Sequence, residues 1–234
     1  MKGKVDVARR TQADRSAATR EALIGAARPL FAEAGFASVS TEAIVHAAQV
    51  TRGALYHQFA DKTELFAAVF ERVEDEVTQR VAAEVGALAE TGESDPVELM
   101  IRGGQAWLSA GADPEVHRIV LVDAPSVLGW TRWRATCLHY ALGLVEGLIA
   151  QAIEAGRIAR QPTRPLAHVL LGASDEAVLY VAESADPDGA RAEMNAALAA
   201  LVRAMALPSG AFTGSHASGC APRGSAVRDA RRAR

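Results

Sequence analysis

Residues 40–65 read STEAIVHAAQVTRGALYHQFADKTEL, a stretch that carries start signals for two short helices in close succession. Ser40 is a favoured N-cap residue before a helix that we expect over Thr41 to Ala48. Thr51 has the same role before a helix expected over Arg52 to Phe59. Helices joined by so short a linker pack as one compact unit.

The second of these helices has an inward and an outward side. Leu55 and Phe59 are one turn apart and are expected to face the core. The outward side carries two further pairs with the same spacing, which are Arg52 with Tyr56 and Gly53 with His57. Glycine permits close approach of the backbone, arginine can donate to guanine or phosphate, and tyrosine and histidine can reach phosphate oxygens or base edges. This face therefore suits the major groove of DNA.

Positions flanking this helix add candidate phosphate contacts. A longer helix is expected to open at Asp61, which has capping-box spacing to Glu64, and to run toward about Ala89. Lys62 lies in its first turn, where its ammonium and the free N–H groups of the helix end favour a phosphate. Ser40, Thr41 and Thr51 can contribute at the two short helices.

Each of these residues also has an ordinary interpretation. Ser40 and Thr51 can serve only as N-caps, Tyr56 as a half-buried aromatic residue and Lys62 as a solvated charge. Their joint occurrence in this order favours the DNA-binding interpretation.

Over about residues 16–70 the sequence resembles the TetR family of transcriptional regulators. Ten positions carry the resemblance: Ile44, Ala48, Val50, Thr51, Gly53, Leu55, Tyr56, Phe59, Lys62 and Leu65. Gln49 departs from the glycine usual in the turn, where a non-glycine residue with positive φ should cost ~1 kcal/mol. Gln58 replaces the usual histidine before Phe59. The resemblance implies a homodimeric repressor that binds near-palindromic operator DNA and is released by a small molecule in its C-terminal domain.

Helical periodicity extends along most of the chain, and alternating β-branched runs are missing, so the expected fold is all-α. We expect a flexible basic arm at residues 1–15, a helix-turn-helix domain at 16–62, a helical effector-binding and dimerisation domain at 63–207, and a disordered basic tail at 208–234. The first helix should cover Ser16 to Ala34 and end at Gly35.

Charge is distributed unevenly among these segments. Residues 1–62 hold nine Lys and Arg against six Asp and Glu, residues 63–207 hold eleven against 21, and residues 208–234 hold five against one. The acidic middle would be repelled by phosphates, so DNA contacts should fall to the N-terminal part. The basic tail is the second candidate for such contacts. Chance differences between solvated faces remain the alternative.

In the larger domain, Pro and Gly signals separate helices expected at about 96–110, 114–122, 126–155, 165–184 and 188–206. The resemblance implies that the last two helices form a four-helix dimer interface with their mates. The expected interface residues are Leu166, Leu170, Ala173, Ala177, Met194, Leu198, Leu201, Val202 and Met205.

The resemblance also implies an effector site in this domain. Its apolar and aromatic candidates are Phe70, Met100, Trp107, Trp130, Trp133 and Tyr140, and its orienting polar candidates are His117, Asp123 and Arg134. Core packing is the alternative for every large apolar residue in this set. We expect a mostly apolar effector, because the candidate set is dominated by aromatic and Met side chains.

Other classes of protein find little support. Motifs for a nucleophilic serine, a phosphate-binding loop or a zinc protease are missing, so the sequence predicts no enzyme activity and no cofactor. His117 and His139 could meet Asp123 or Cys137 at a metal, but lone helical histidines are more often structural, and no metal is expected. The charged N-terminus and the lack of 18 uninterrupted apolar residues predict a cytoplasmic protein with no membrane partner.

Overall fold

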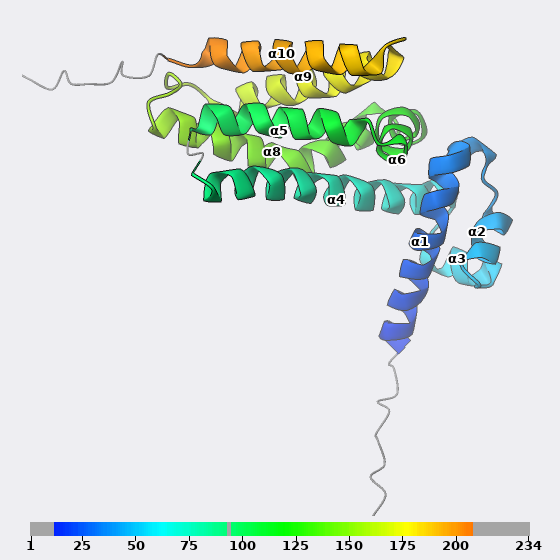
Figure 1. The fold of residues 1–234 in the computed structure, drawn as a ribbon. Coiled ribbons are helices and arrows are strands. Elements are labelled where there is room, and N and C mark those ends of the chain that lie inside the picture. Colours follow the sequence, from blue (N-terminus) through cyan, green and yellow to red (C-terminus); the bar gives the residue numbers. More distant parts are fainter. Residues whose placement is uncertain (1–11, 93–94, 208–234) are drawn as a thin grey trace, which may run out of the picture.

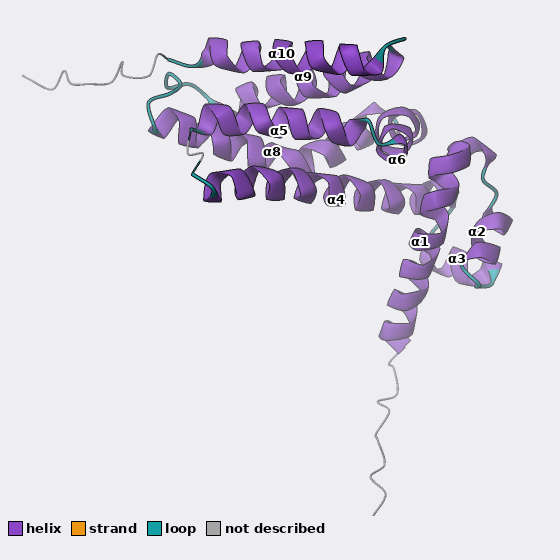
Figure 2. Ribbon diagram, viewed as in Figure 1, coloured by secondary structure: helices purple, strands orange, loops and turns teal. Residues whose placement is uncertain are grey.

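The computed structural model describes residues 12–92 and 95–207, and all the regular elements in these ranges are helical (Figures 1 and 2). One isolated antiparallel bridge joins Ile158 to Ala206. The all-α prediction is confirmed. The elements in order are α1 (Gln12–Ser38), α2 (Thr41–Ala47), α3 (Arg52–Gln58), α4 (Lys62–Glu90), α5 (Pro96–Gly111), α6 (Pro114–Val116), the π-helix η1 (His117–Asp123), α7 (Ala124–Leu128), α8 (Trp130–Glu154), α9 (Thr163–Glu183) and α10 (Pro187–Met205).

The first three helices and the start of α4 form a small unit at one end of the molecule (Figure 1). Its centre is aromatic: the Phe31 and Phe66 rings meet edge to face with centroids 5.2 Å apart, and Phe36 lies at the same distance from Phe66. Leu55 on α3 is fully buried against this centre. Apolar burial therefore holds α1, α3 and α4 together and fixes how α3 is presented.

The predicted caps are confirmed. Backbone N–H groups donate to Ser40 Oγ from Ala43 (3.1 Å), to Thr51 Oγ1 from Ala54 (3.2 Å) and to Asp61 Oδ1 from Glu64 (2.9 Å). A full capping box would also have the Glu64 carboxylate accept the backbone N–H of Asp61. That part of the prediction is wrong, because the Glu64 carboxylate binds Arg132 of α8.

α1 differs from its predicted bounds at both ends. It begins at Gln12, so the flexible arm predicted over 1–15 is wrong for its last four residues, while residues 1–11 lie outside the described range. Apolar periodicity cannot reveal this polar turn; Ser16, just beyond it, accepts a hydrogen bond from Gln58 of α3 at 2.8 Å. At the other end Gly35 interrupts the helix with φ +76°, as expected for its end, and one further turn follows to Ser38.

The larger domain is a stack of long helices, in which α4, α5 and α8 lie beneath α9 and α10 (Figure 1). α8 is long and apolar enough to resemble a membrane span, but it packs against α4, α5, α7 and α9 as the central helix of the bundle. A second apolar core, including Ile149 and Ile158, joins α5, α8, α9 and α10.

Two predicted helices are divided in the structure. The helix expected at 114–122 is a short α-helical turn followed by the π-helix η1. The helix expected at 126–155 is broken by Gly129, whose φ of +77° lies in the left-handed region and separates α7 from α8. α6 and η1 both contact α1, so the first of these divisions lies where the larger domain meets α1.

Candidate DNA-binding surface and internal pocket

α3 presents the polar face that the sequence predicts. Leu55 is 0% exposed and Phe59 is buried, whereas Arg52, Tyr56 and His57 are exposed. The inward and outward assignment of these side chains is confirmed. A short helix with a cationic, an aromatic and an imidazole side chain on one outer face is able to read base edges and bind phosphates.

Arg52 is positioned by its neighbours. Its Nη1 donates to Glu42 Oε1 at 2.7 Å, and its guanidinium lies 5.5 Å from the centre of the Tyr56 ring. The ion pair is well exposed on both sides, and such pairs contribute little to stability. Arg52 can therefore leave Glu42 for a guanine or phosphate at small cost.

The turn between α2 and α3 contains a non-glycine residue in a left-handed conformation. Gln49 has φ +55°, the position at which the sequence predicted strain, and it alone among described non-glycine residues has positive φ. Backbone bonds on both sides hold the turn, including Val50 N–H to Val45 O at 3.0 Å. The turn therefore adopts the left-handed conformation although Gln49 has a side chain.

Lys62 has a structural role that the sequence did not reveal. Its ammonium donates to the carbonyl oxygens of Phe36 (2.8 Å) and Val39 (2.9 Å) and lies 4.1 Å from the centre of the Phe36 ring. The interpretation of Lys62 as a simple solvated charge is wrong, because it ties α4 to the loop between α1 and α2. An ammonium has three donors, so one N–H remains for a phosphate.

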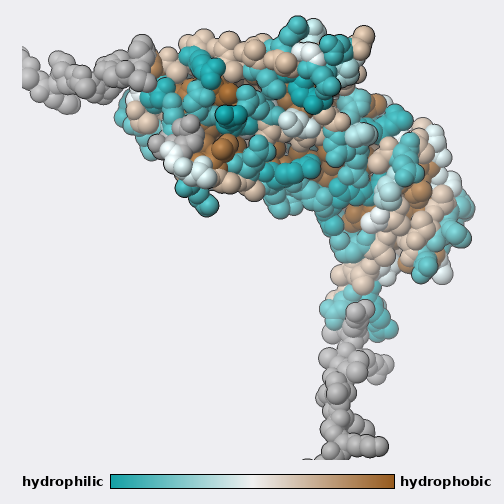
Figure 3. Space-filling model, viewed as in Figure 1, coloured by the Kyte–Doolittle hydropathy of each residue, from teal (hydrophilic) through white to brown (hydrophobic). Residues whose placement is uncertain are grey.

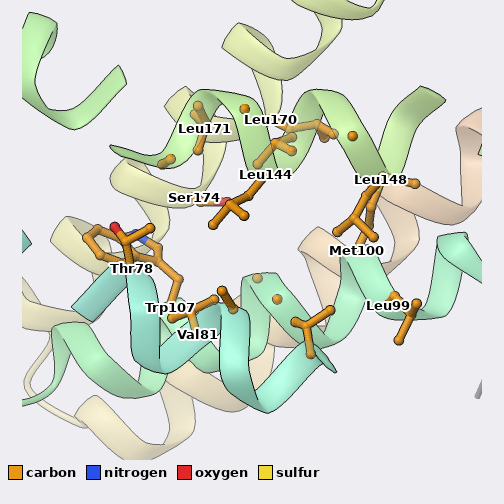
Figure 4. A pocket seen from close by; sticks show the side chains of 18 of the residues that line it. Thr78, Val81, Leu99, Met100, Trp107, Leu144, Leu148, Leu170, Leu171 and Ser174 are labelled. Carbon is orange, nitrogen blue, oxygen red and sulfur yellow. The ribbon is translucent and has the colours of Figure 1, made fainter. Parts of the chain in front are cut away.

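A cavity of about 460 Å³ lies inside the larger domain, between α4, α5, α8, α9 and α10. Figure 4 shows side chains from four of these helices pointing into one space, including Thr78, Trp107, Leu144 and Leu170. Hydrophobic surface is visible between α4 and α5 from outside (Figure 3). The volume is within the range of small-molecule sites.

One part of the cavity wall is ionisable. Glu74 of α4 is 2% exposed, and Asp175 of α9 pairs with Arg134 of α8 at 3.0 Å. Burial, with a smaller contribution from the charge of Asp175, raises the pKa of the Glu74 carboxyl to about 7. Burial likewise raises the pKa of Asp175 to about 6, against the opposing effect of Arg134. Burial also raises the pKa of the Cys137 thiol beside Glu74.

Three of the nine expected effector residues line this cavity: Met100, Trp107 and Arg134. The other six lie outside its lining: Phe70, His117, Asp123, Trp130, Trp133 and Tyr140. Phe70 and Trp133 are buried core residues, and the Trp133 indole N–H donates to Val120 O at 2.8 Å. Trp130 is 67% exposed and is the first residue of α8, directly after Gly129.

The expected dimer residues mostly face the interior of their own chain. Leu170, Ala177 and Val202 are buried, and Leu170, Leu198 and Val202 line the cavity. Met194, Leu166 and Met205 are partly buried against the two cores, and Ala173 is half-buried. Of the nine, Leu201 is the exposed one. The apolar stripes of α9 and α10 therefore pack largely on the cores of their own chain, and Leu201 faces outward.

Polar contacts join the two parts of the molecule at the corner between α1 and α2. Asp123 of η1, which the sequence placed in the effector site, accepts the Phe36 N–H at 2.8 Å. Arg28 of α1 donates to both oxygens of Glu115 of α6, at 2.8 and 2.7 Å, and to Glu76 of α4 at 2.6 Å. The α1–α3 unit is therefore held directly by α4, α6 and η1.

Sequence reasoning missed Glu74, although a signal was available. Val73 and Val77 belong to the apolar face of α4, and Glu74 stands within it as a charged residue. A carboxylate on a buried face needs a partner or a function. Thr78, one turn further on, also lines the cavity.

Comparisons with known protein families match both parts of the chain. Residues 23–69 match the family model described as bacterial regulatory proteins, tetR family, and residues 97–205 match the model described as tetracyclin repressor-like, C-terminal domain. The α3 surface lies in the first range, and α8, α9 and most of α5 lie in the second.

Individual proteins give the same result. A crystal structure of a TetR-family transcriptional regulator from Pectobacterium atrosepticum is 34% identical, with 85% of this chain and 98% of that chain covered and a TM-score of 0.71. The Transposon Tn10 TetC protein of Escherichia coli is 24% identical over 154 residues, or 66% of this chain and 75% of that protein. The HTH-type transcriptional regulator CymR of Pseudomonas putida is 38% identical over 93 residues, which are 40% of this chain and 45% of CymR.

Proposed function

Because the chain belongs to the TetR family and is a DNA-binding transcriptional regulator, we propose that it is a cytoplasmic repressor that binds its operator as a homodimer and leaves it when a small, mostly apolar effector enters the internal pocket. The observation that carries the proposal is the combination of an exposed polar face on α3 with a cavity of about 460 Å³ in the other domain.

DNA contacts are assigned to the outer face of α3 and to the helix starts around it. In this proposal Arg52, Gly53, Tyr56 and His57 contact base edges or phosphates, whereas Ser40, Thr41, Thr51 and Lys62 contact the phosphate backbone. The caps leave N–H groups at the starts of α2 and α4 close to these side chains, which favours anions there.

A homodimer supplies the second recognition helix, and it requires an outward apolar surface. α9 and α10 carry three exposed large apolar residues: Val169, Tyr180 and Leu201. We define these three as the outer patch and assign the dimer contact to it, in place of the buried residues expected from the sequence. A two-fold dimer predicts a near-palindromic operator with half-sites one helical turn apart or a multiple of it.

Effector binding can reach α3 through the corner between α1 and α2. Arg134 lines the pocket and is adjacent to Trp133, whose indole N–H holds the Val120 carbonyl of η1. η1 in turn holds Phe36 through Asp123. A shift of α8 on ligand entry would move η1, then α1 and the recognition helix, and so change the separation of the two helices in the dimer.

The size of the response is set by linkage. An effector weakens operator binding only through its difference in affinity between the DNA-competent and released shapes, and a tenfold effect requires ~1.4 kcal/mol of such difference. Operator DNA must weaken effector binding by the same factor. Measuring both factors tests whether pocket and DNA surface belong to one equilibrium.

Selection of DNA fragments by the pure protein, followed by sequencing, tests the DNA-binding part of the proposal. The expected product is an enriched near-palindrome that the protein shifts in a gel at lower concentration than a scrambled sequence of equal composition. Enrichment of non-palindromic DNA, or equal affinity for both sequences, would contradict the proposed mode of binding.

Sedimentation tests the assembly. The wild type should sediment as a dimer at micromolar concentration, and Tyr180→Arg with Leu201→Arg should give a folded monomer with weaker operator binding, because charges replace the outer patch. Val122→Arg, at another exposed apolar residue, is the matched control and should leave the mass unchanged. A double variant that stays dimeric would exclude the outer patch as the interface.

A further inference from the structure

Two polar atoms in the pocket wall have no hydrogen-bond partner, although the Glu74 carboxyl as a whole has the Cys137 thiol as a neighbour. These atoms are Glu74 Oε2 and Trp107 Nε1, and both are buried. Among the described residues, no other side chain that lines the pocket has a buried, unpaired polar atom. One is an acceptor when ionised, and the other is a donor. Leaving such groups unsatisfied costs free energy, so their presence in a cavity points to a ligand that satisfies them.

The ionisable groups around Glu74 leave one negative charge uncompensated. From α8 it is faced by Arg134, by the thiol of Cys137 and by the phenol of Tyr140, and from α9 by Asp175. The Arg134 charge is already paired with Asp175 at 3.0 Å, and both side chains are largely buried. Arg134 is the one Lys or Arg side chain among the described residues that line the pocket, so in this part of the chain an ionised Glu74 finds no further partner of opposite charge in the wall.

Without a ligand, protonation of Glu74 neutralises this carboxylate. Burial favours the protonated, neutral form of the Glu74 carboxyl and so raises its pKa to about 7. A ligand amine with an ordinary pKa near 10 would be protonated at the same pH and can replace the proton with a charge-assisted hydrogen bond. Such bonds are stronger in a low-dielectric site than in water.

The remainder of the pocket sets the shape of the ligand. On α4 the lining extends from Glu74 to Ala89, which corresponds to roughly 20 Å along the helix axis. Away from Glu74 the wall is mostly apolar, with Gln151 and Ser174 as polar members, and it includes five glycines: Gly86, Gly103, Gly104, Gly143 and Gly147. A side chain built at four of them would meet nothing within 4 Å, and at Gly103 only Val85 at 3.5 Å, so their lack of side chains keeps this space open.

We propose that the effector is a cationic amphiphile, an elongated apolar molecule with one basic amine, and that Glu74 binds the amine while the indole N–H of Trp107 binds a neutral oxygen where the ligand has one. This inference rests on the proposed function and narrows its effector to one chemical class. Glu74 is thereby the specificity-determining residue of the pocket, and the glycine-lined end accepts the apolar body.

Three probes with the same ten-carbon chain test the proposal: decylamine, decanol and decanoate. They carry a positive, a neutral and a negative head group at pH 8, where Glu74 is mostly ionised. Binding is measured by calorimetry and by intrinsic tryptophan fluorescence, to which Trp107 in the pocket wall contributes. Wild-type protein should bind decylamine at least tenfold more tightly than decanol, and decanoate most weakly.

Glu74→Gln keeps the shape of the side chain but removes its charge, and it should reduce the preference for decylamine over decanol to twofold or less. Asp75→Asn is the matched control, since it removes the same charge from the next residue of α4, outside the pocket, and should keep the tenfold preference. This control separates recognition by Glu74 from general attraction of a cation to an acidic domain.

A measurement on the unaltered protein does not depend on the variant folding. As the pH falls from 8 to 6, protonation of Glu74 should weaken the preference for decylamine in the wild type. A preference that stays constant over this range, or equal binding of decylamine and decanol, would overturn the amine assignment while leaving an effector pocket in place. Tightest binding of decanoate would make Arg134 the anchor and overturn it as well. If none of the three probes binds or weakens the operator complex, the effector pocket itself fails.

Discussion

The α3 surface and the internal pocket use the same residue types for opposite purposes. At α3, Leu55 and Phe59 fill the space beneath the helix, so the polar outer face rests on a close-packed core. At the pocket, Leu144, Met100 and Trp107 surround about 460 Å³ that their own chain leaves unfilled. A surface that reads DNA needs a fixed shape, whereas a site that transmits ligand binding needs a packing defect that a ligand can fill.

The largest expected effect follows from this difference in packing. Leu55→Ala should lower the free energy of unfolding by about 2–5 kcal/mol, because a fully buried side chain leaves a cavity behind. Leu144→Ala should cost less than about 1 kcal/mol, since Leu144 is 44% exposed and already borders open space. Chemical denaturation of both variants measures the contrast. Equal losses would mean that the pocket is as tightly packed as the core under α3.

The same contrast explains what the sequence could predict. The 3.6-residue period separates Leu55 from Arg52 and Tyr56, so one helix was sufficient to predict which side of α3 is buried and which is exposed. The pocket depends on how five helices pack together, and no local pattern tells Met100, which lines it, from Trp133, which does not. Likewise, periodicity finds the apolar stripe of α9 but does not say whether Leu170 packs on its own chain or on a partner.

The next largest effect concerns the buried carboxyl of the pocket. Its pKa is raised from 4.5 to about 7, so between these pH values the folded protein keeps a proton that the unfolded chain has lost. The free energy of unfolding therefore falls as the pH rises through this window, by roughly 3 kcal/mol from Glu74 alone. Above pH 7 this contribution stays constant.

Glu74→Gln removes this titration. The stability of the variant relative to wild type should therefore increase by roughly 2–3 kcal/mol between pH 5 and pH 8, as measured by denaturant unfolding at each pH. Asp75→Asn, on the same helix, provides the control. A wild-type and a Glu74→Gln curve that stay parallel over this range would show that Glu74 is not a buried carboxyl that holds its proton in the folded state.

A smaller effect is expected at the exposed face of α3. Tyr56→Ala or Arg52→Ala should weaken specific operator binding by ~1–3 kcal/mol, with little change in stability because both side chains are exposed. Gel shifts and thermal unfolding measure the two quantities separately. Unchanged operator affinity in the double variant would exclude this face as the recognition surface.

Replacing Lys62 should affect both DNA binding and the stability of the fold. Lys62→Ala removes the proposed phosphate contact and should weaken binding to all DNA sequences alike, with a salt slope reduced by about one per subunit. It also removes two hydrogen bonds to the α1–α2 loop, at about 1 kcal/mol each, so the variant should be less stable, unlike Tyr56→Ala. A stability equal to that of wild type would show that these bonds do not hold the corner.

The smallest effect is expected in the turn that precedes α3. Gln49 has φ +55°, a conformation that a side chain disfavours by about 1 kcal/mol and that glycine adopts freely. Glycine also gains entropy in the unfolded chain, which offsets part of this difference. Gln49→Gly should therefore raise the free energy of unfolding by a few tenths of a kcal/mol and at most ~1 kcal/mol, without changing operator affinity.

Ala47→Gly, two residues earlier in α2, is the control and should instead cost about 1 kcal/mol, because there glycine replaces a favourable helical residue. If the two glycine variants lose stability equally, the turn is not strained in solution, and Gln49 contributes a contact that compensates for its backbone conformation.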